Sequence, residues 1–217
     1  MDQATSSSRV DTEATAERRA RILDAAERCI VRAGFHRTTM QDVAAEAGMS
    51  PGNLYRYFRS KDMIVAGLAE RDRTQMAAEL SALENTDDFI QAFASLGRKH
   101  FEEEPRERAI LCLQIWAEAM RNPTFAALTG DFERELVGRI AQLLGAAQER
   151  GVVSTTSDPV AIALVIAALA DGLFVRRAIA PDFDAGREVG HVMKVVGAML
   201  DGTIDLSSDK TTCGAPS

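Results

Sequence analysis

Residues that build metal centres and disulfide frameworks are scarce in this sequence. Its 217 residues include three cysteines and three histidines. Cys29, Cys112 and Cys213 lie far apart, and no pair of cysteines or histidines has the spacing of a zinc site. We therefore expect no metal ion. Cys29 and Cys112 lie in apolar helical contexts and are predicted to be reduced core thiols.

Motifs of common enzyme classes are also missing. The sequence contains no Gly-rich phosphate loop, no nucleophile elbow and no cluster of histidine, cysteine and carboxylate residues. The acidic run Glu102-Glu103-Glu104 lies beside Pro105 and is better explained as a solvated helix end than as paired catalytic carboxylates. We expect neither catalytic residues nor a cofactor.

Long hydrophobic runs are absent as well. The longest nearly apolar run, from Pro159 to Ala170, is too short to span a bilayer. No apolar run follows a basic stretch near the N-terminus, so we expect no secretory signal. These observations predict a cytoplasmic protein without a membrane partner.

The composition is that of a globular protein with one large core or two unequal domains, 46% apolar and 26% charged. A net charge of −7 argues against a protein that coats nucleic acid without regard to sequence. The charge is uneven, however: residues 1–61 carry a balance of +2 and residues 62–217 a balance of −9. A local basic region at one end is compatible with specific DNA binding.

Two short helices joined by a tight turn are predicted between Thr38 and Lys61. Thr39-Met40-Gln41-Asp42 has the form of a capping box, so a helix should begin just after Thr39. Gly48 is suited to the left-handed conformation that ends a helix. Ser50-Pro51 then begins the second helix, with Ser as the N-cap and Pro at the first helical position.

These two helices have the pattern of a helix-turn-helix. The motif needs a small residue where its helices touch, a turn residue, and an apolar anchor in the second helix, and Ala44, Gly48 and Leu54 fill these places. Leu54 and either Tyr57 or Phe58 should turn inward. The outer face of the second helix is then formed by Gly52, Asn53, Tyr55 and Arg56.

The residues around the motif extend the match. Gly34-Phe35-x-x-Thr38-Thr39 precedes it, and Leu54-Tyr55-x-Tyr57-Phe58-x-Ser60-Lys61 ends it. Over about residues 16–70 the sequence resembles the DNA-binding domain of the TetR (AcrR-like) family of bacterial transcriptional regulators. The resemblance implies an all-α fold of about nine helices, in which a three-helix DNA-binding domain precedes a larger helical domain for effector binding and dimerisation.

The second helix of the motif is expected to contact DNA in two ways. Gly52 and Asn53 lie in its first turn, where the backbone approaches closely and an amide can hydrogen-bond a base edge. Tyr57 either contacts a thymine methyl group or packs inward, and Arg56 has no fixed counterpart in the family. The resemblance implies that the remaining contacts, to phosphates, come from Thr39, Ser50, Tyr55 and Lys61, with Pro51 beginning the helix.

Helical spacing of apolar residues continues through the rest of the chain, with no repeats and no convincing strands. We predict a disordered arm at residues 1–15, a DNA-binding domain at residues 16–62 and a linking helix from residue 61. An effector-binding and dimerisation domain should cover residues 63–201, and a disordered tail residues 202–217.

The predicted helix that begins at Pro159 is apolar on nearly every side, so it must be buried on all sides. It either lies inside its own domain or packs one face against a second subunit. Small residues in the last two helices favour a four-helix dimer interface, which the family resemblance also implies. The residues predicted at this interface are Ala163, Ala167, Gly172, Val189, Met193, Val196 and Gly197.

The family resemblance further implies a cavity for a small molecule among the central helices. An aromatic-lined cavity with few polar groups would accept a flat or hydrophobic ligand. The alternative is that these aromatics simply fill the core. The candidate effector-binding residues are Phe93, His100, Phe101, Trp116, Met120, Phe125, Phe132 and Phe174.

Together these patterns predict a sequence-specific DNA-binding transcriptional regulator. The simplest form is a homodimeric repressor that a small, largely apolar effector releases from palindromic double-stranded operator DNA. Two alternatives remain open: an activator of the same fold, or a helix-turn-helix protein that acts only through protein contacts.

Overall fold

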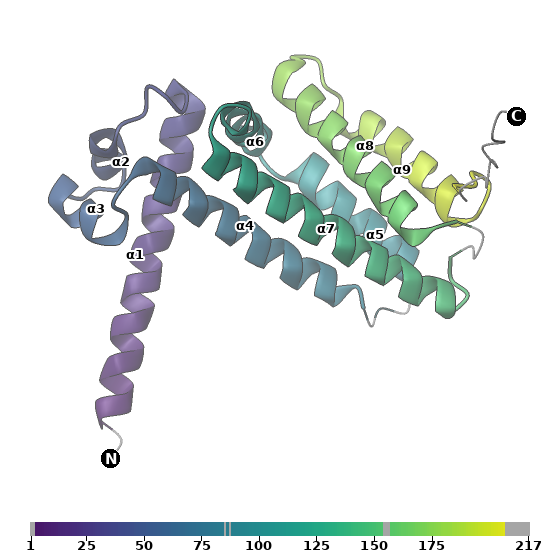
Figure 1. Ribbon diagram of the computed structural model, residues 1–217, viewed down its shortest axis with the longest axis horizontal. Helices are drawn as coiled ribbons and strands as arrows, with labels where there is room; N and C mark the ends of the chain where they lie inside the picture. The colour runs from purple at the N-terminus through teal and green to yellow at the C-terminus, as the bar shows by residue number, and fades with distance from the viewer. Residues whose placement is uncertain (1–2, 85, 87, 154–156, 207–217) are drawn as a thin grey trace, which may run out of the picture. The chain divides into compact units, whose positions relative to one another are not determined.

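The structure is all helical, as predicted. The computed structural model describes residues 3–84, 86, 88–153 and 157–206, with side chains from residue 14 onward. Within these residues there are nine α-helices, one short π-helix and no strand (Figure 1). Cys213 and most of the predicted C-terminal tail lie outside the described residues, and so do residues 1 and 2 of the predicted arm.

The helices follow the order expected from the sequence. Their bounds are α1 (Gln3–Ala33), α2 (Met40–Glu46), α3 (Pro51–Tyr57), α4 (Lys61–Ala82), α5 (Phe89–Arg98), the π-helix η1 (Lys99–Glu103), α6 (Arg106–Ala119), α7 (Pro123–Glu149), α8 (Pro159–Ile179) and α9 (Ala185–Leu200).

The N-terminus differs from the prediction. Residues 3–15 form the first turns of α1 and not a separate arm. The stretch from residue 3 to residue 33 contains neither glycine nor proline, so nothing in it interrupts a helix that begins early. The polar composition of these residues had favoured disorder over this continuity.

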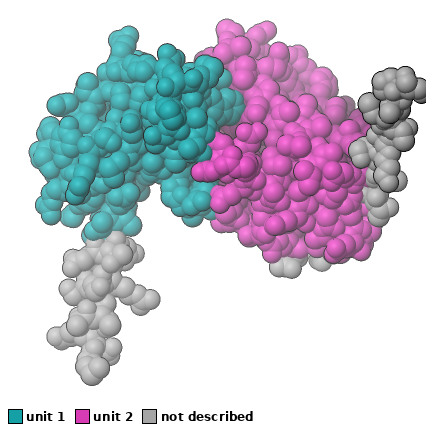
Figure 2. All heavy atoms as spheres, viewed as in Figure 1, with its two compact units in different colours: residues 1–74, 107–129 teal, residues 75–106, 130–217 magenta. Residues whose placement is uncertain are grey.

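The chain forms two compact units, and neither is a continuous segment. Unit 1 comprises residues 1–74 and 107–129, and unit 2 comprises residues 75–106 and 130–217 (Figure 2). We had predicted one boundary near residue 62. Instead, α6 and the first turns of α7 belong with the helix-turn-helix helices, because they contribute to the same core.

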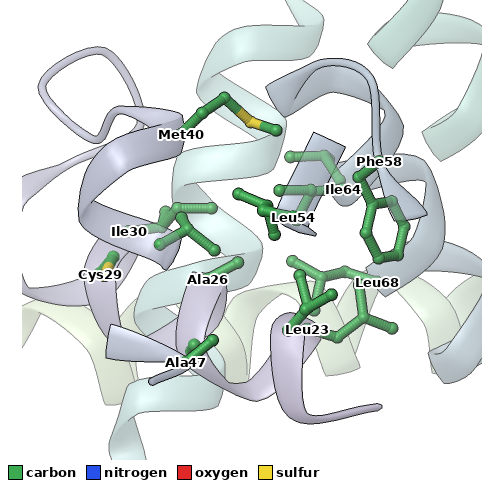
Figure 3. Close-up of a cluster of buried hydrophobic side chains, with 14 of the residues drawn as sticks. Leu23, Ala26, Cys29, Ile30, Met40, Ala47, Leu54, Phe58, Ile64 and Leu68 are labelled. Atoms are coloured by element: carbon green, nitrogen blue, oxygen red, sulfur yellow. The ribbon is translucent and has the colours of Figure 1, made fainter. Parts of the chain in front are cut away.

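The core of unit 1 surrounds the helix-turn-helix. Leu54 of α3 is fully buried among side chains from α1 and α4, including Ala26 and Ile64 (Figure 3). Leu111 of α6 and Phe125 of α7 are buried in the same cluster. Ala44 has no exposed surface, as expected for the small residue at the contact between the two helices.

Local hydrogen bonds fix the ends of α2 and α3 as the sequence predicts. The Thr39 hydroxyl accepts from the Asp42 backbone N–H at 3.2 Å, and the Thr39 N–H donates to the Asp42 carboxylate at 2.9 Å. These two bonds complete the capping box. Gly48 has a φ of +68°, the left-handed conformation that glycine adopts without steric cost. Ser50 caps α3 by accepting from the Asn53 N–H at 3.3 Å.

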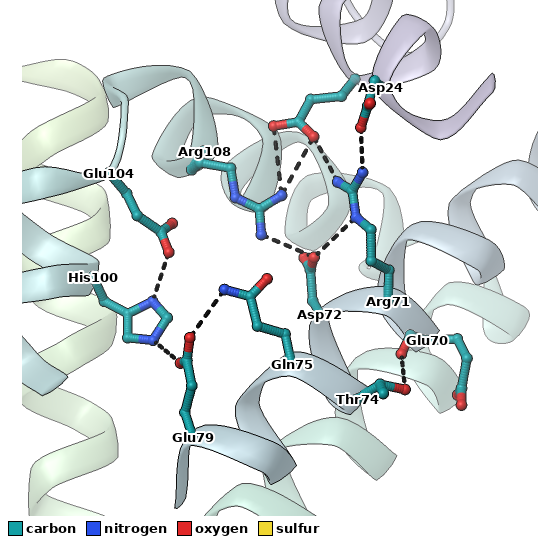
Figure 4. A network of polar contacts seen from close by, with 11 residues as sticks. Asp24, Glu70, Arg71, Asp72, Thr74, Gln75, Glu79, His100, Glu104 and Arg108 are labelled. Atoms are coloured by element: carbon teal, nitrogen blue, oxygen red, sulfur yellow. Dashed lines mark hydrogen bonds and ion pairs between the residues drawn. The ribbon is translucent and has the colours of Figure 1, made fainter. Parts of the chain in front are cut away.

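Ion pairs link α1, α4 and α6 within unit 1 (Figure 4). Arg71 of α4 pairs with Asp24 and Glu27 of α1, each at 2.7 Å. Arg108 of α6 pairs with Asp72 at 2.8 Å and with Glu27 at 3.3 Å. Two arginines and three carboxylates thus form one network, and such a network has better defined geometry than an isolated surface pair.

Unit 2 contains the second hydrophobic core, which α5, α7, α8 and α9 build together with the end of α4. Leu144, Ile162 and Met199 are among its fully buried side chains. Arg106 closes the C-terminal end of α8 by donating to the carbonyls of Arg177 and Ala178. Two of the carbonyl groups that lack a partner within the helix are thereby satisfied.

Helix α8 is long and apolar enough to cross a membrane, judged by length and composition. The run that we judged from sequence ended at Ala170 and was shorter than the helix that forms. Core helices of globular proteins meet the same criterion, so this property is weak support for a membrane span.

Phe125→Ala tests whether α7 belongs to the folding unit of the helix-turn-helix. We expect the free energy of unfolding to fall by about 3–5 kcal/mol, because the change leaves a cavity in the core of unit 1. Chemical denaturation measures this loss, and native-state hydrogen exchange locates it in residues 22–58.

Phe132→Ala is the matched control, because Phe132 is a half-buried phenylalanine of the same helix that lies in unit 2. It should leave exchange in residues 22–58 unchanged. Equal exchange in these residues for wild type and Phe125→Ala would contradict the discontinuous unit.

Candidate functional site

Helix α3 presents a face that is free of the core. Leu54 has no exposed surface, whereas Gly52, Tyr55 and Arg56 are exposed and Asn53 is half-buried. The apolar anchor therefore fixes the helix while the predicted contact residues point away from it. A two-turn helix held in this way can enter a major groove, which is wide enough to admit an α-helix.

Tyr57 is turned inward. Its side chain packs against the core of unit 1, and its hydroxyl lies 3.5 Å from the Arg18 guanidinium. Its carbonyl accepts from Arg19 at 3.3 Å, and the Arg19 guanidinium lies 4.4 Å from the centre of the Phe58 ring. These contacts favour the second of the two alternatives for Tyr57, an inward-packed ring.

The hydroxyl groups of Thr39 and Ser50, both predicted to contact phosphates, differ in whether their hydrogen is already used in a hydrogen bond. A hydroxyl has a single hydrogen. Thr39 donates its hydrogen to the Asp42 carboxylate at 2.7 Å. Ser50 only accepts, from the Asn53 N–H. Ser50 can therefore donate to a phosphate as it stands, whereas Thr39 must first rotate its hydroxyl away from Asp42.

Hydrogen bonds from Thr39, first from its hydroxyl and then from its backbone N–H, lower the pKa of Asp42. Asp42 thus places an ionised carboxylate in the first turn of α2. The helix dipole favours negative charge at this N-terminal end.

Lys61 is held by the turn between α1 and α2. Its ammonium group donates to the carbonyls of Phe35 and Thr38 and lies 4.0 Å from the centre of the Phe35 ring. Partial burial lowers the pKa of Lys61, against the opposing effect of Asp62 and Glu118. An ammonium group has three N–H donors, so one remains for a phosphate.

Helix α6 holds the same turn from its other side. The Phe35 N–H donates to the Gln114 side-chain oxygen at 2.9 Å, and His36 lies 2.9 Å from the carboxylate of Glu118. The Phe35 ring meets the Phe125 ring edge-on, with 5.2 Å between centroids. Gln114 and Glu118 thus support the turn that holds Lys61, and nothing local in the sequence indicates this.

A hollow of about 290 Å³ borders this turn in unit 1. The exposed surface of its wall is mostly apolar, and three of its polar side chains, Gln114, Glu118 and His36, already bind one another or the turn.

A smaller and almost wholly apolar cavity lies inside unit 2. Its volume is about 120 Å³, and side chains from α4, α5, η1, α7, α8 and α9 line it. Four of the predicted effector residues are among them, namely Phe93, His100, Phe101 and Phe174. Phe101 and Phe174 meet edge-on with 4.9 Å between ring centroids.

The other four predicted effector residues do not line this cavity. Trp116, Met120 and Phe125 belong to unit 1, where Phe125 is buried in the core and Met120 is 82% exposed. Phe132 lies in unit 2 but outside the cavity wall. Aromatic content was therefore a poor guide, since most of the wall consists of aliphatic residues that sequence cannot distinguish from core.

The predicted dimer residues lie in different environments within the protomer. Val189, Met193 and Val196 line the cavity, and Ala163 and Ala167 are buried inside the protomer. Gly172 is exposed and Gly197 is half-buried. Because α8 is apolar around most of its circumference, periodicity could not identify which of its faces is covered.

An exposed apolar stripe does run along α8. Val160 is 49% exposed and Leu164 52%, about one turn apart on one face, and Ile179 at the C-terminal end of the helix is 68% exposed. Val195 on α9 adds a further exposed apolar side chain.

The polar end of the cavity is a chain of three side chains, Glu79, His100 and Glu104 (Figure 4). The His100 Nε2 lies 2.7 Å from Glu79 Oε2, and its Nδ1 lies 3.1 Å from Glu104 Oε1. Burial alone would lower the pKa of His100, but the two carboxylates outweigh it and raise that pKa. Among the described residues, no group of His, Cys, Asp or Glu is arranged to hold a metal ion.

Burial would also raise the pKa of Glu79. Hydrogen bonds from Lys99, Gln75 and His100 outweigh this effect and lower it to about 2. We did not single out Glu79 from the sequence, because its position in α4 lies far along the chain from His100.

The chain matches two family descriptions. Residues 22–68 match "Bacterial regulatory proteins, tetR family", and residues 98–201 match "BetI-type transcriptional repressor, C-terminal". Together they cover the helix-turn-helix and most of unit 2.

Individual relatives agree with these matches. The transcriptional regulator UidR of Escherichia coli K12 is 29% identical over 140 residues, covering 63% of this chain and 69% of UidR. The regulator BetI of Burkholderia mallei is 29% identical over 175 residues, covering 75% of this chain and 83% of BetI.

A solved structure from Saccharomonospora viridis, described as a putative transcriptional regulator in complex with choline, is similar throughout. The two structures superpose with a TM-score of 0.71 at 25% sequence identity. The matched region covers 84% of this chain and 96% of the Saccharomonospora viridis chain. The helix-turn-helix, the all-helical second unit and these relatives lead to one conclusion: the chain belongs to the TetR family of DNA-binding bacterial transcriptional regulators.

Proposed function

We propose that the protein is a cytoplasmic, homodimeric repressor that binds a palindromic operator and is released by a small, largely apolar effector. The observation that carries this proposal is the exposed face of α3, fixed from behind by the buried anchor Leu54. A helix with this face has no structural need for exposed Tyr55 and Arg56, whereas a DNA-reading helix does.

The proposed DNA contacts divide into reading and positioning. Asn53, in the first turn of α3, hydrogen-bonds a base edge, and Gly52 lets the backbone approach. Ser50, Tyr55 and Lys61 contact phosphates, as does Thr39 after its hydroxyl rotates, and these contacts set the register. Arg56 is exposed and supplies positive charge at the same face.

Dimerisation is proposed through the exposed stripe of α8. Val160, Leu164 and Ile179 would bury their apolar surface against the same residues of a second copy, as a two-fold interface requires. A dimer presents two copies of α3 to successive major grooves, about 34–36 Å apart. This symmetry is the reason for expecting a palindromic operator.

The cavity of unit 2 is proposed as the effector site. Its apolar wall supports this, as do the match of residues 98–201 to a BetI-type repressor domain and the choline bound in the Saccharomonospora viridis relative. An effector lowers operator affinity only if it binds more tightly to the conformation that does not fit DNA. A tenfold release needs about 1.4 kcal/mol of such preference.

Repression is preferred to activation because a dimer on its operator excludes polymerase without any further contact surface. An enzyme is disfavoured, since the relatives are transcriptional regulators. A protein that acts only through protein contacts would not need the exposed α3 face.

Selection of bound DNA from a random duplex pool tests the proposal most directly. The expected result is a palindrome whose half-sites are separated by one helical turn or a multiple of it. Recovery of no enriched sequence would favour the protein-contact alternative, and a transcription assay on the selected operator would separate repression from activation.

Replacing Lys61 and Asn53 separately distinguishes phosphate contacts from base contacts. Lys61→Ala should weaken binding to all duplexes alike and lower the slope of log affinity against log salt by about one. Asn53→Ala should cost about 1–3 kcal/mol at one base position in each half-site and leave the salt slope unchanged.

Fluorescence anisotropy on the selected operator and on single-base variants, each over a range of salt, measures both effects. Identical behaviour of the two variants would show that the roles are wrongly assigned.

Leu164→Arg tests the proposed dimer surface. A charge in the centre of an apolar interface should shift the protein from dimer to monomer in sedimentation and weaken operator binding at least tenfold, because burying an unpaired charge is costly. Ile90→Arg is the matched control, since Ile90 is an exposed aliphatic residue of α5 in the same unit. A stable dimer of Leu164→Arg would refute this interface.

A further inference from the structure

Of the described residues that line the unit 2 cavity, only His100 is titratable. Each of its ring nitrogens lies within hydrogen-bond distance of a carboxylate oxygen. The Nε2 atom faces the carboxylate of Glu79, and the Nδ1 atom faces the carboxylate of Glu104. A carboxylate can only accept, so both ring nitrogens donate and the ring is an imidazolium. The three side chains are mostly buried, with 13%, 15% and 18% of His100, Glu79 and Glu104 exposed.

The ring therefore has no hydrogen bond left to offer a ligand. A neutral histidine would present one donor and one acceptor, and either could bind a polar group in the cavity. Here Glu79 and Glu104 occupy both positions. The rest of the wall is apolar, with glycine and alanine besides aliphatic and phenylalanine side chains.

The polar end also carries no net negative charge that would compensate a cationic ligand. Glu79 pairs with Lys99 as well as with His100, so two carboxylates face two cations. The buried guanidinium of Arg177 donates to the backbone carbonyls of His100 and Glu104, which adds positive charge at this end. A ligand cation would lose its hydration without gaining a carboxylate that is free of a cation.

The cavity is small. Its volume is about 120 Å³, and a protein cavity of about 150 Å³ lined by leucine, isoleucine and phenylalanine stays dry and binds benzene. The wall here contains the same three residue types, together with valine, methionine, alanine, glycine and His100. Phe93, Phe101 and Phe174 add ring surface that could attract a quaternary ammonium group, as aromatic cages do. A cationic ligand is thus the rival to be tested.

We propose that this cavity takes an uncharged molecule of about benzene's size that lacks hydrogen-bonding groups, and that Glu79 and Glu104 determine this preference by occupying both ring nitrogens of His100. The inference rests on the proposed role of the cavity as the effector site. It names the ligand class and assigns Glu79 and Glu104 as specificity-determining residues.

Isothermal titration calorimetry of the full-length protein without DNA tests the ligand class. Ethylbenzene, benzylammonium and benzoate share a ring and a similar size but are neutral, cationic and anionic, and choline serves as the quaternary ammonium probe. We expect ethylbenzene to bind and each charged probe to bind at least tenfold more weakly. Binding of any charged probe as tightly as ethylbenzene, or no binding of ethylbenzene, overturns the proposal.

Ala170→Leu locates the binding site. Ala170 lines the cavity, so the larger side chain should fill it and abolish ethylbenzene binding while circular dichroism shows an intact helical fold. Ala78→Leu makes the same substitution at an exposed position of α4 in unit 2 and should bind ethylbenzene as the wild type does. Unchanged binding by Ala170→Leu would place the ligand elsewhere and contradict the proposal.

Glu104→Ala tests how the preference is set. Removing this carboxylate frees the His100 Nδ1–H and leaves the imidazolium with a single carboxylate partner. Benzoate should then bind at least tenfold more tightly than to the wild type, while ethylbenzene binding changes little. A purely structural role for Glu104 would weaken both ligands together, and that result would refute the assignment.

Operator release is measured separately by anisotropy. If ethylbenzene binds with the expected selectivity but leaves operator affinity unchanged, the ligand class stands and the effector role in the proposed function fails. If operator binding is normal but no neutral ligand binds, the regulator stands and the ligand class fails.

Discussion

Burial of Leu111 and Phe125 together with Leu54 in one core is the constraint on which the DNA-binding unit depends. Seven-residue helices such as α2 and α3 are too short to be stable alone, so their positions are set by what they pack against. Part of that support comes from α6 and α7, more than fifty residues further along the chain. Helix α3 therefore belongs to the same folding unit as α6 and the first turns of α7, although residues 75–106 of unit 2 separate them in the sequence.

The sequence was informative wherever the interaction is local. The Thr39–Asp42 capping box, the Gly48 turn and the Ser50 cap all join residues within a few positions, and each forms as predicted. The contact between Phe35 and Gln114 spans 79 positions, and no local pattern indicates it. The all-apolar α8 posed a different problem: its residues showed that it must be covered, but their periodicity could not separate the face toward the cavity from the face toward a partner.

The short π-helix η1 accounts for the chemistry at the polar end of the cavity. It carries Lys99 and His100 at the junction of α5 and α6, and Arg177 donates to the carbonyl of His100 within it and to that of Glu104 directly after it. π-Helical turns are uncommon and are frequently found at functional sites. Here the turn places a histidine in an otherwise apolar wall, and the surrounding carboxylates then decide what that histidine can offer.

Internal hydrogen bonds restrain the half-buried charge of Lys61. A free lysine side chain loses up to about 2 kcal/mol of rotamer entropy when it is immobilised. In this protein the carbonyls of Phe35 and Thr38 and the ring of Phe35 already restrain the ammonium group. The ordering has been completed during folding, so a phosphate that meets this lysine encounters a preorganised donor and association carries a smaller entropic penalty.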